Sequence, residues 1–470
     1  MKKLGRMGKK TEMVFLALAL AGSVAFAWQS IRSATIWYDE TITLLTVAGH
    51  TTPDWSLGRA QFAGSADFQQ ILTQLYRGDV HPPLYFWTVA IWRVLAGRSL
   101  ESVRLLSALF MAATVYLLYR VSERFPMRWP VVPALIYACS GAAIRYAFTA
   151  RSYAMANFLI VLTLYCAQRR SRWTGPVAAC SAATHYFSAL CVAPLLLVYC
   201  GMRWKSDRRW ALWTASSFAA LFALLVPLLL VHFGARPDQF AGPGRFTDDI
   251  AAALNGAYAA CFPISTVSRI TNATKLVAVA YLVVGMILSI RRGEPAAGVT
   301  GACFLGGFVV LSVVSHKPVA NMPVAYYFGF LAPLSALLAG FGVEAVPAGF
   351  PALAGLLLLS LANLRSSTRD RSDWRGTVAS IRKQCDSCAI VVGAGSGRGV
   401  PASVLYEAGR IPVLVLSRQS FEKVVEQAAE LDRFVLVPSK EPDSAAAEEE
   451  FIARFHMHSV KGYFALPDDH

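Results

Sequence analysis

The stretch MVFLALALAGSVAFAWQSI, residues 13–31, indicates the class of fold. A bilayer core of about 30 Å needs about 20 helical residues to cross it, and this uncharged run has that length. Five of the ten residues at the start of the chain are Lys or Arg, and no small-x-small cleavage site follows the run. We therefore expect an uncleaved membrane helix, with the N-terminus in the cytoplasm by the positive-inside rule.

The composition of the whole chain agrees with a membrane protein. Of its 470 residues, 55% are hydrophobic and 16% are charged, whereas soluble proteins carry about 25% charged residues. The 44 Lys and Arg against 29 Asp and Glu give a net charge of +15, which alone would suggest a nucleic-acid partner. The N-terminal tail and four predicted cytoplasmic loops hold 17 of these basic residues. The excess charge is mostly a topology signal, and no nucleic-acid partner is expected.

Further apolar runs predict a polytopic helical protein with about eleven crossings. Besides 13–31 they are 101–119, 130–146, 152–168, two short helices within 173–202 that meet at Thr184-His185-Tyr186, 210–231, 273–290, 298–315, 324–343 and 349–363. Residues 82–97 are apolar too, but only 13 residues lie between the two prolines and Gly97. At 1.5 Å per residue they reach about 20 Å, which is too short to span, so we expect an interfacial helix.

With 82–97 outside the membrane, four Arg-rich loops fall on the cytoplasmic side; their basic residues lie at 120–128, 169–172, 203–209 and 291–292. Three long segments then lie outside: 32–100, 232–272 and the tail from about 365. We expect a transmembrane domain over 1–364, which includes the outer loop 32–100, and a small extracytoplasmic α/β domain over 365–470. The protein is expected in the bacterial cytoplasmic (inner) membrane.

The tail predicts a domain of alternating strands and helices. Its apolar strands are 389–393, 411–416 and 434–438, separated by helical stretches as in βαβ units. Cys385 and Cys388 are spaced either for a disulfide or for a redox pair.

Two carboxylates, Asp39 and Glu40, begin the first outer loop directly after the first helix. The plainest interpretation is that Asp39 caps a short helix over 41–48. Several cations are also predicted at the outer ends of the crossings; they are Arg104, Arg145, Arg151, His185 and Lys317. His81 is predicted at the start of the interfacial helix, where two prolines fix the entry. A single Arg there is most often an interfacial anchor, but the positive-inside rule predicts few on this face.

Carboxylates opposite cations at headgroup level suit an anionic lipid donor and a hydroxyl acceptor. A glycosidase needs two carboxyl groups because its alkoxide leaving group must be protonated. A lipid phosphate leaves as a stable anion, so one base suffices, with cations to stabilise the departing phosphate. Asp39 fits this base, and Glu40 could orient the sugar or the acceptor.

Five stretches in order resemble the GT-C superfamily of membrane glycosyltransferases, in particular the protein mannosyltransferase and lipid A aminoarabinose transferase group. They are Trp37-Tyr38-Asp39-Glu40, His81-Pro82-Pro83-Leu84-Tyr85, Arg104-Leu105-Leu106-Ser107-Ala108-Leu109, Ala150-Arg151-Ser152-Tyr153-Ala154 and Thr184-His185-Tyr186-Phe187. The resemblance implies a GT-C fold and inverting transfer of a sugar from a polyprenyl phosphate on the outer face of the membrane. It also implies Asp39 as general base and places Arg104 near the lipid phosphate. The family's late Arg-Tyr pair is not matched, since Val324 and Ala325 follow Pro323, and Lys317 is the nearby cation.

Several features stay open at this level. A polytopic transporter or flippase of a lipid-linked glycan would also have many helices and outer-face cations. The sugar is undetermined, and the acceptor is a lipid, a polysaccharide or a protein. No cofactor is certain; Asp39 and Glu40 could hold a divalent metal, although no further acidic ligand is clearly placed beside them.

Overall fold

The computed structural model describes residues 8–235, 282–292, 295, 298–299, 328–345, 373–384, 388–393, 399–409, 411–431, 433–438, 442–460 and 463–466. The chain divides into two compact units. Unit 1 holds Met1–Arg32, Val80–Thr88 and Glu101–Asp370, and unit 2 holds Ser33–Asp79, Val89–Leu100 and Arg371–His470.

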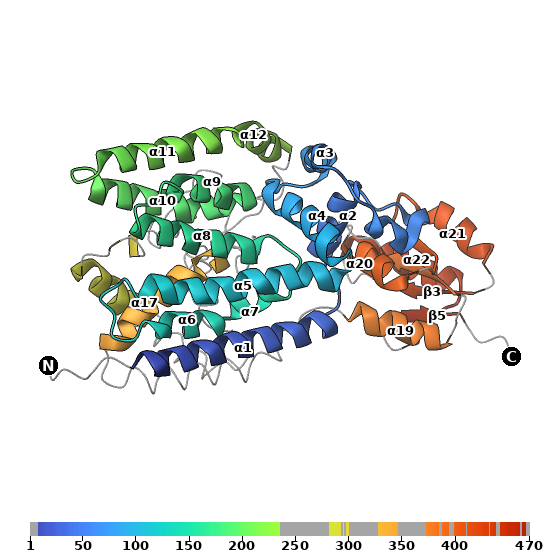
Figure 1. The fold of residues 1–470 in the computed structure, drawn as a ribbon. Helices are drawn as coiled ribbons and strands as arrows, with labels where there is room; N and C mark the ends of the chain where they lie inside the picture. The colour runs from blue at the N-terminus through green and yellow to red at the C-terminus, as the bar shows by residue number, and fades with distance from the viewer. Residues whose placement is uncertain are drawn as a thin grey trace. The chain divides into compact units, whose positions relative to one another are not determined.

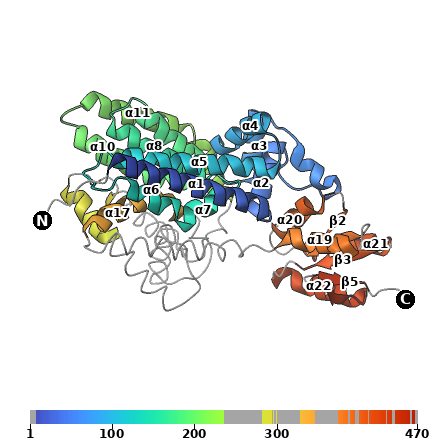
Figure 2. The same ribbon diagram turned by 60° about the horizontal axis from the view of Figure 1, so that its bottom comes forward.

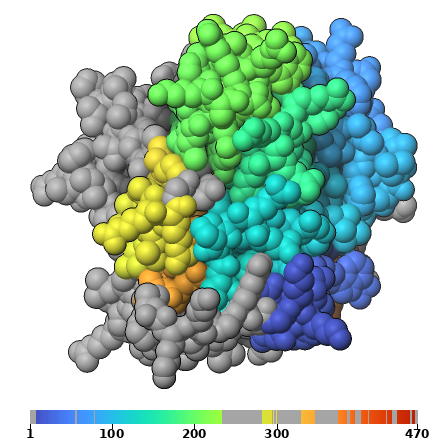
Figure 3. All heavy atoms as spheres, turned by 60° about the vertical axis from the view of Figure 1, so that its left-hand side comes forward, coloured from blue at the N-terminus to red at the C-terminus, as the bar shows by residue number. Residues whose placement is uncertain are grey.

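Unit 1 is a bundle of helices (Figure 1). Its helices are α1 (Lys9–Ser33), α5 (Leu100–Ser122), α6 (Val131–Ala138), α7 (Gly141–Ala147), α8 (Tyr153–Gln168), α9 (Thr174–Thr184), α10 (Tyr186–Arg203), α11 (Arg208–Ala223), α12 (Val226–Ala235), η4 (Phe328–Leu331), α17 (Ala332–Ala345) and a helix at Leu282–Arg291. Helices α11 and α1 form opposite outer layers of this bundle, and both reach its surface in Figure 3. Their surfaces expose large apolar side chains such as Leu18, Trp28 and Trp213, as lipid-facing helices do.

Within the described residues, α1, α5 and α10 are long and apolar enough to cross a membrane. A fourth span is the pair α11–α12, which is bent by 49°. Pro227 in the first turn of α12 suits a helix that starts anew after the bend. Helix Leu282–Arg291 covers part of the expected run 273–290, whereas 298–315 and 349–363 lie almost wholly outside the described residues. The predicted total of eleven crossings is therefore not confirmed.

Two local expectations for unit 1 turn out differently. The run 130–146 is not one helix: α6 ends at Ala138, and Ser140 begins α7 by accepting a hydrogen bond from the Ala143 backbone N at 3.2 Å. A serine hydroxyl competes well for the first N–H groups of a helix, so it ends one helix and starts another. The run 173–202 does form two helices, α9 and α10, with His185 between them as predicted.

Helix α4 (Leu84–Ala96) has the 13 residues expected for the interfacial helix. It follows two prolines, which suit a helix start, and ends at Gly97, whose φ of +93° is a left-handed conformation open to glycine. Its orientation to a membrane stays a prediction.

Unit 2 combines the segment predicted to be the first outer loop with the tail. From the loop come α2 (Tyr38–Ala48), η1 (Trp55–Ala63) and α3 (Phe68–Gly78). From the tail come α19 (Trp374–Gln384), β1 (Ala389–Gly393), α20 (Gly399–Ala408), β2 (Val413–Leu416), α21 (Phe421–Ala429), β3 (Phe434–Val437), α22 (Pro442–Arg454), β4 (His458–Val460) and β5 (Tyr463–Ala465). The predicted domain boundary at 364/365 lies outside the described residues.

The strands form one sheet in the order β2-β1-β3-β5-β4. Strands β2, β1 and β3 are parallel, as the βαβ pattern predicted, and β5 is antiparallel to β3 and β4. Helices α19 and α20 lie on one side of this sheet and α22 on the other (Figure 2). Side chains of α21 and α22, including Val424 and Phe451, pack on one face to form the core of the tail. Cys388, just before β1, is disulfide-bonded, whereas Cys385 lies outside the described residues.

Hydrogen bonds fix the outer loop to the tail. The Arg59 backbone N donates to the Gly409 carbonyl at 3.2 Å, and the Thr35 hydroxyl donates to the Asp373 carboxylate at 3.3 Å. Arg93 on α4 is 4% exposed and donates through Nη2 to the Phe62 carbonyl at 2.7 Å. Burial, aided by the charge of Arg98, lowers the pKa of Arg93 to about 10. These contacts join the loop and the tail within unit 2.

Candidate functional site

The predicted carboxylate pair lies in the first turn of α2, in unit 2. Glu40 is fully buried, and its Oε2 accepts a hydrogen bond from the backbone N of Trp37 at 2.8 Å. Asp39 is half-buried, one position before Glu40. A carboxylate in the first turn of a helix is stabilised by the helix dipole and by the unsatisfied N–H groups there.

The geometry corrects the interpretation of Asp39 as the helix cap. Trp37 is the N-cap residue of α2, and Glu40, three positions later, reaches back to its N–H. This is the Glu half of a capping box, so Glu40 rather than Asp39 fixes the first turn of the helix. The Asp39 carboxylate is therefore not needed for that cap.

A second group of predicted residues meets in unit 1. His81 lies just before α4, and Arg151 lies in the short turn between α7 and α8. The Arg151 Nη2 atom is 3.1 Å from Nε2 and 3.3 Å from Nδ1 of His81. Because a guanidinium only donates, a ring nitrogen of His81 that accepts from it must carry no proton. Arg151 itself is 3% exposed.

His185 joins this pair from the junction of α9 and α10. Its Nδ1 accepts from the backbone N of Phe187 at 3.3 Å, so the ring caps α10. The side chain is 3% exposed, and its ring lies 5.2 Å from that of His81 in an edge-to-face arrangement. We call His81, Arg151 and His185 the basic cluster. Its guanidinium and imidazole groups are of the kind that donate hydrogen bonds to phosphate oxygens.

Aromatic side chains surround the basic cluster. The Phe330 ring lies 4.6 Å and the Tyr153 ring 5.6 Å from the ring of His185. Asn157 on α8 donates to the Gly329 carbonyl at 3.1 Å, which holds η4 beside α8. Tyr153 lies in one of the five motif stretches, whereas nothing in the sequence near Phe330 indicates that it would reach His185.

Arg104, which the resemblance places near the lipid phosphate, lies close to the end of α1. It lies on α5 with no exposed surface, and its Nη1 donates to the Ile31 carbonyl at 3.2 Å. One turn later, the Ser107 hydroxyl donates to the Thr149 carbonyl at 2.7 Å, which links α5 to the turn that carries Arg151. Arg104 therefore contributes to helix packing at the end of α1, and its contact with the donor phosphate stays a prediction.

The remaining candidates are divided between parts of the chain. Lys317 and the 323–327 stretch lie outside the described residues. Asp39 and Glu40 belong to unit 2 and the basic cluster to unit 1. Within the described residues, no group of three or more His, Cys, Asp or Glu is placed to hold a metal ion.

The part of the chain that carries the basic cluster has known relatives. Residues 80–232 match the family described as dolichyl-phosphate-mannose-protein mannosyltransferase. The matched segment is about a third of the chain. The match confirms the resemblance to the GT-C mannosyltransferase group, and with it an integral-membrane glycosyltransferase that uses a lipid-linked donor. It does not favour a transporter or flippase.

Solved structures also resemble the chain. The ArnT of Cupriavidus metallidurans bound to undecaprenyl phosphate is 12% identical over 96% of this chain and 97% of its own, with a TM-score of 0.43. The Archaeoglobus fulgidus oligosaccharyltransferase, tethered to an acceptor peptide, is 13% identical over 91% of this chain and 69% of its own, with a TM-score of 0.46. A comparison with curated proteins gave no match.

Proposed function

We propose that the chain transfers a sugar from a polyprenyl-phosphate donor to a hydroxyl acceptor, on the outer face of the bacterial cytoplasmic membrane and with inversion. The observation that carries this proposal is the basic cluster. Three elements distant in sequence bring a guanidinium and two imidazoles together within the segment that matches the mannosyltransferase family model. Such a group suits the phosphate of a lipid-linked donor better than a neutral sugar.

In this proposal the basic cluster binds the donor phosphate and stabilises it as it leaves. The acceptor oxygen forms a bond to the anomeric carbon from the side opposite the phosphate, while the bond from that carbon to the phosphate oxygen breaks. The electron pair of the broken bond goes to the phosphate, whose negative charge increases. The positive guanidinium of Arg151 stabilises this growing negative charge.

Asp39 accepts the proton of the acceptor hydroxyl as general base. Its carboxylate is half-buried, and the capping hydrogen bond at the start of α2 is made by Glu40; both observations support this assignment. Glu40 is then a positioning residue, because its hydrogen bond to Trp37 fixes the turn that carries Asp39. His81 and His185 are assigned to the donor phosphate, together with Arg104 and Lys317 as the sequence predicted. In this proposal the first outer loop and the domain over 365–470 lie on the outer side of the membrane.

The test of the phosphate site uses Arg151→Gln and Arg151→Lys in the purified full-length protein. A charged hydrogen bond contributes about 1.5–3 kcal/mol, which corresponds to an increase in the donor KM of about 10-fold to 150-fold for the Gln variant. The Lys variant should recover part of that loss because it keeps the charge. Arg124→Gln, on the predicted cytoplasmic side, is the matched control and should leave the KM unchanged. An unchanged donor KM in Arg151→Gln would contradict the site.

A further inference from the structure

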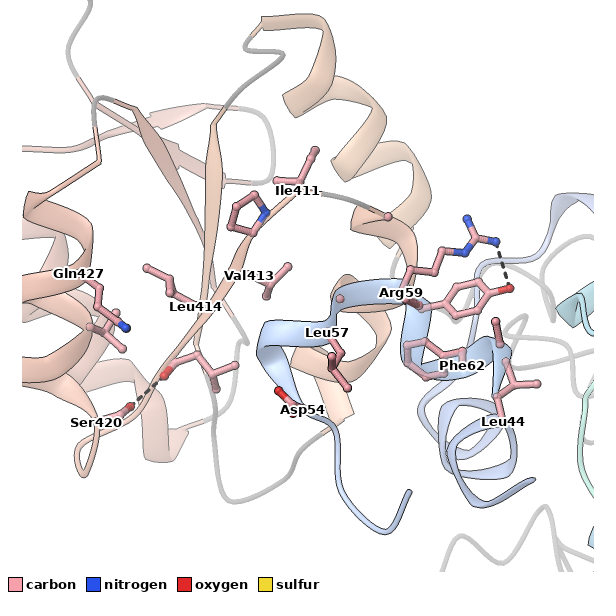
Figure 4. A pocket seen from close by; sticks show the side chains of 18 of the residues that line it. Leu44, Asp54, Leu57, Arg59, Phe62, Ile411, Val413, Leu414, Ser420 and Gln427 are labelled. Carbon is pink, nitrogen blue, oxygen red and sulfur yellow. Dashed lines mark hydrogen bonds between the residues drawn. The ribbon is translucent and has the colours of Figure 1, made fainter. Parts of the chain in front are cut away.

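A long groove in unit 2 has no part in the site described above. It has a volume of about 1420 Å³ and is lined by η1, the end of α20, β2 and α21 (Figure 4). One wall comes from the first outer loop and includes Leu57 and Phe62, and the other comes from α21 and includes Gln427. Strand β2 runs between these walls.

Strand β2 is an edge strand, and its edge faces the groove. Among the described strands it pairs only with β1. The Pro412 carbonyl accepts from Ile390 N at 2.9 Å, so the backbone groups of Pro412 point to β1. Because a strand alternates, those of Val413 and Val415 point away from β1. The Ser420 hydroxyl, which donates to the Val415 carbonyl at 2.8 Å, is consistent with this orientation.

The side chains along β2 alternate between the two walls. In Figure 4, Val413 points toward Leu57, and Leu414 points toward Gln427. An extended chain placed beside β2 would likewise send successive side chains to opposite walls. Backbone hydrogen bonds to an edge strand together with side-chain pockets on either side are the features of peptide binding by strand addition.

The groove is basic. Arg59, Arg98 and Lys423 line it with exposed side chains, and Asp54 is the acidic residue among its lining. None of the three cations pairs with a carboxylate within the part of the chain that the structure describes. The Arg59 guanidinium lies 4.4 Å from the centre of the Tyr406 ring, which holds it at the groove. An acidic ligand therefore complements these walls.

We propose that this groove binds an extended, acidic polypeptide segment as an added strand on β2. An anionic glycan would also suit the charge, but it would leave the backbone edge of β2 unused. The binding of such a segment does not depend on the proposed function. The statement that the segment belongs to the acceptor does rest on the proposed function. The groove would then recognise an acidic stretch of a protein acceptor, so that acceptor selection takes place away from the transfer site.

The experiment measures binding of a fluorescein-labelled ten-residue peptide of alternating Thr and Glu to the full-length protein in nanodiscs. Fluorescence anisotropy is recorded without any sugar donor. Val413→Pro removes the outward N–H, a change that edge strands tolerate, whereas Val413→Ala keeps that N–H. Lys423→Glu reverses a charge in the groove, and Lys383→Glu makes the same change on α19, outside the groove lining.

We expect Val413→Pro to weaken binding about tenfold relative to Val413→Ala, the effect of one lost hydrogen bond. Lys423→Glu should weaken binding by a similar factor, and Lys383→Glu should leave it unchanged. Melting curves show whether each variant is folded. The comparison of Lys423→Glu with Lys383→Glu tests the proposal even if Val413→Pro fails to fold.

Two results from the variants and the competition assay would overturn the proposal. One is equal peptide affinity in Lys423→Glu and Lys383→Glu. The other is a hyaluronan hexasaccharide that displaces the peptide and depends on Lys423 but not on Val413, which would assign the groove to an anionic glycan. Sugar transfer is measured separately on the same preparations. Intact transfer without peptide binding would refute this proposal alone, and peptide binding without transfer would refute the proposed function alone.

Discussion

Glu40 offers a test of how the first turn of α2 positions Asp39. The carboxylate is fully buried and accepts from Trp37 N at 2.8 Å. Glu40→Ala leaves that N–H without its charged acceptor, which costs about 1.5–3 kcal/mol of the free energy of unfolding. Glu40→Gln keeps an acceptor oxygen in place, so it should cost about 1 kcal/mol or less.

The consequence for transfer follows from the position of Asp39. A displacement of about 1 Å at a reacting group can lower a rate about 100-fold, so we expect a fall in kcat of that order in Glu40→Ala. Glu40→Gln should keep most of the kcat, because the helix still begins at the same residue. The assays are transfer of radiolabelled sugar from a polyprenyl-phosphate donor and thermal unfolding in the same detergent.

Asp67 provides the matched control for this comparison. It caps α3, also in unit 2, where its Oδ1 accepts from Gln70 N at 2.7 Å. Asp67→Ala should lower the melting temperature while kcat is retained. If Glu40→Gln remains as stable as the wild type yet loses transfer as fully as Glu40→Ala, Glu40 acts on the substrate directly and the positioning argument is wrong.

Two further predictions concern stability. Gly58→Ala should destabilise unit 2 by about 1–3 kcal/mol, because Gly58 has a φ of +53° and an added Cβ would lie 3.2 Å from the Gly409 carbonyl oxygen. The control is Gly201→Ala on α10, where an added Cβ meets open space. A melting temperature of Gly58→Ala that is unchanged and equal to that of the control would contradict this prediction. Ser140→Ala should cost about 1 kcal/mol in chemical unfolding because α7 loses the acceptor for Ala143 N, and Ser140→Asp, which keeps an acceptor, should restore most of it.

Sequence patterns predicted those elements whose ends are set by local chemistry. Two prolines and Gly97 bound α4. In the tail, short apolar runs separated by helical stretches predicted the three parallel strands at the correct positions. The short strands β4 and β5 were not predicted, because a three-residue run such as His458–Val460 shows no clear periodicity of apolar residues.

The candidate site shows the same limit. The motif residues His81, Arg151 and His185 were predicted one by one, and the structure brings them together. Phe330 contributes to their surroundings only through long-range packing, which no local pattern reports. Likewise, the choice between Asp39 and Glu40 as the cap residue depends on where α2 begins, and helix ends are the least predictable part of a helix.

The most direct test of the central claim is sugar transfer by Asp39→Asn in the purified full-length protein. The variant keeps the shape of the side chain but cannot accept the acceptor proton. In the wild type, radiolabelled sugar should become covalently attached to the acceptor. In Asp39→Asn the rate of sugar transfer should be lower by about 100-fold to 10,000-fold, whereas the donor KM and the melting temperature should be unchanged. Transfer by Asp39→Asn at the wild-type rate would contradict the assignment of Asp39 as general base.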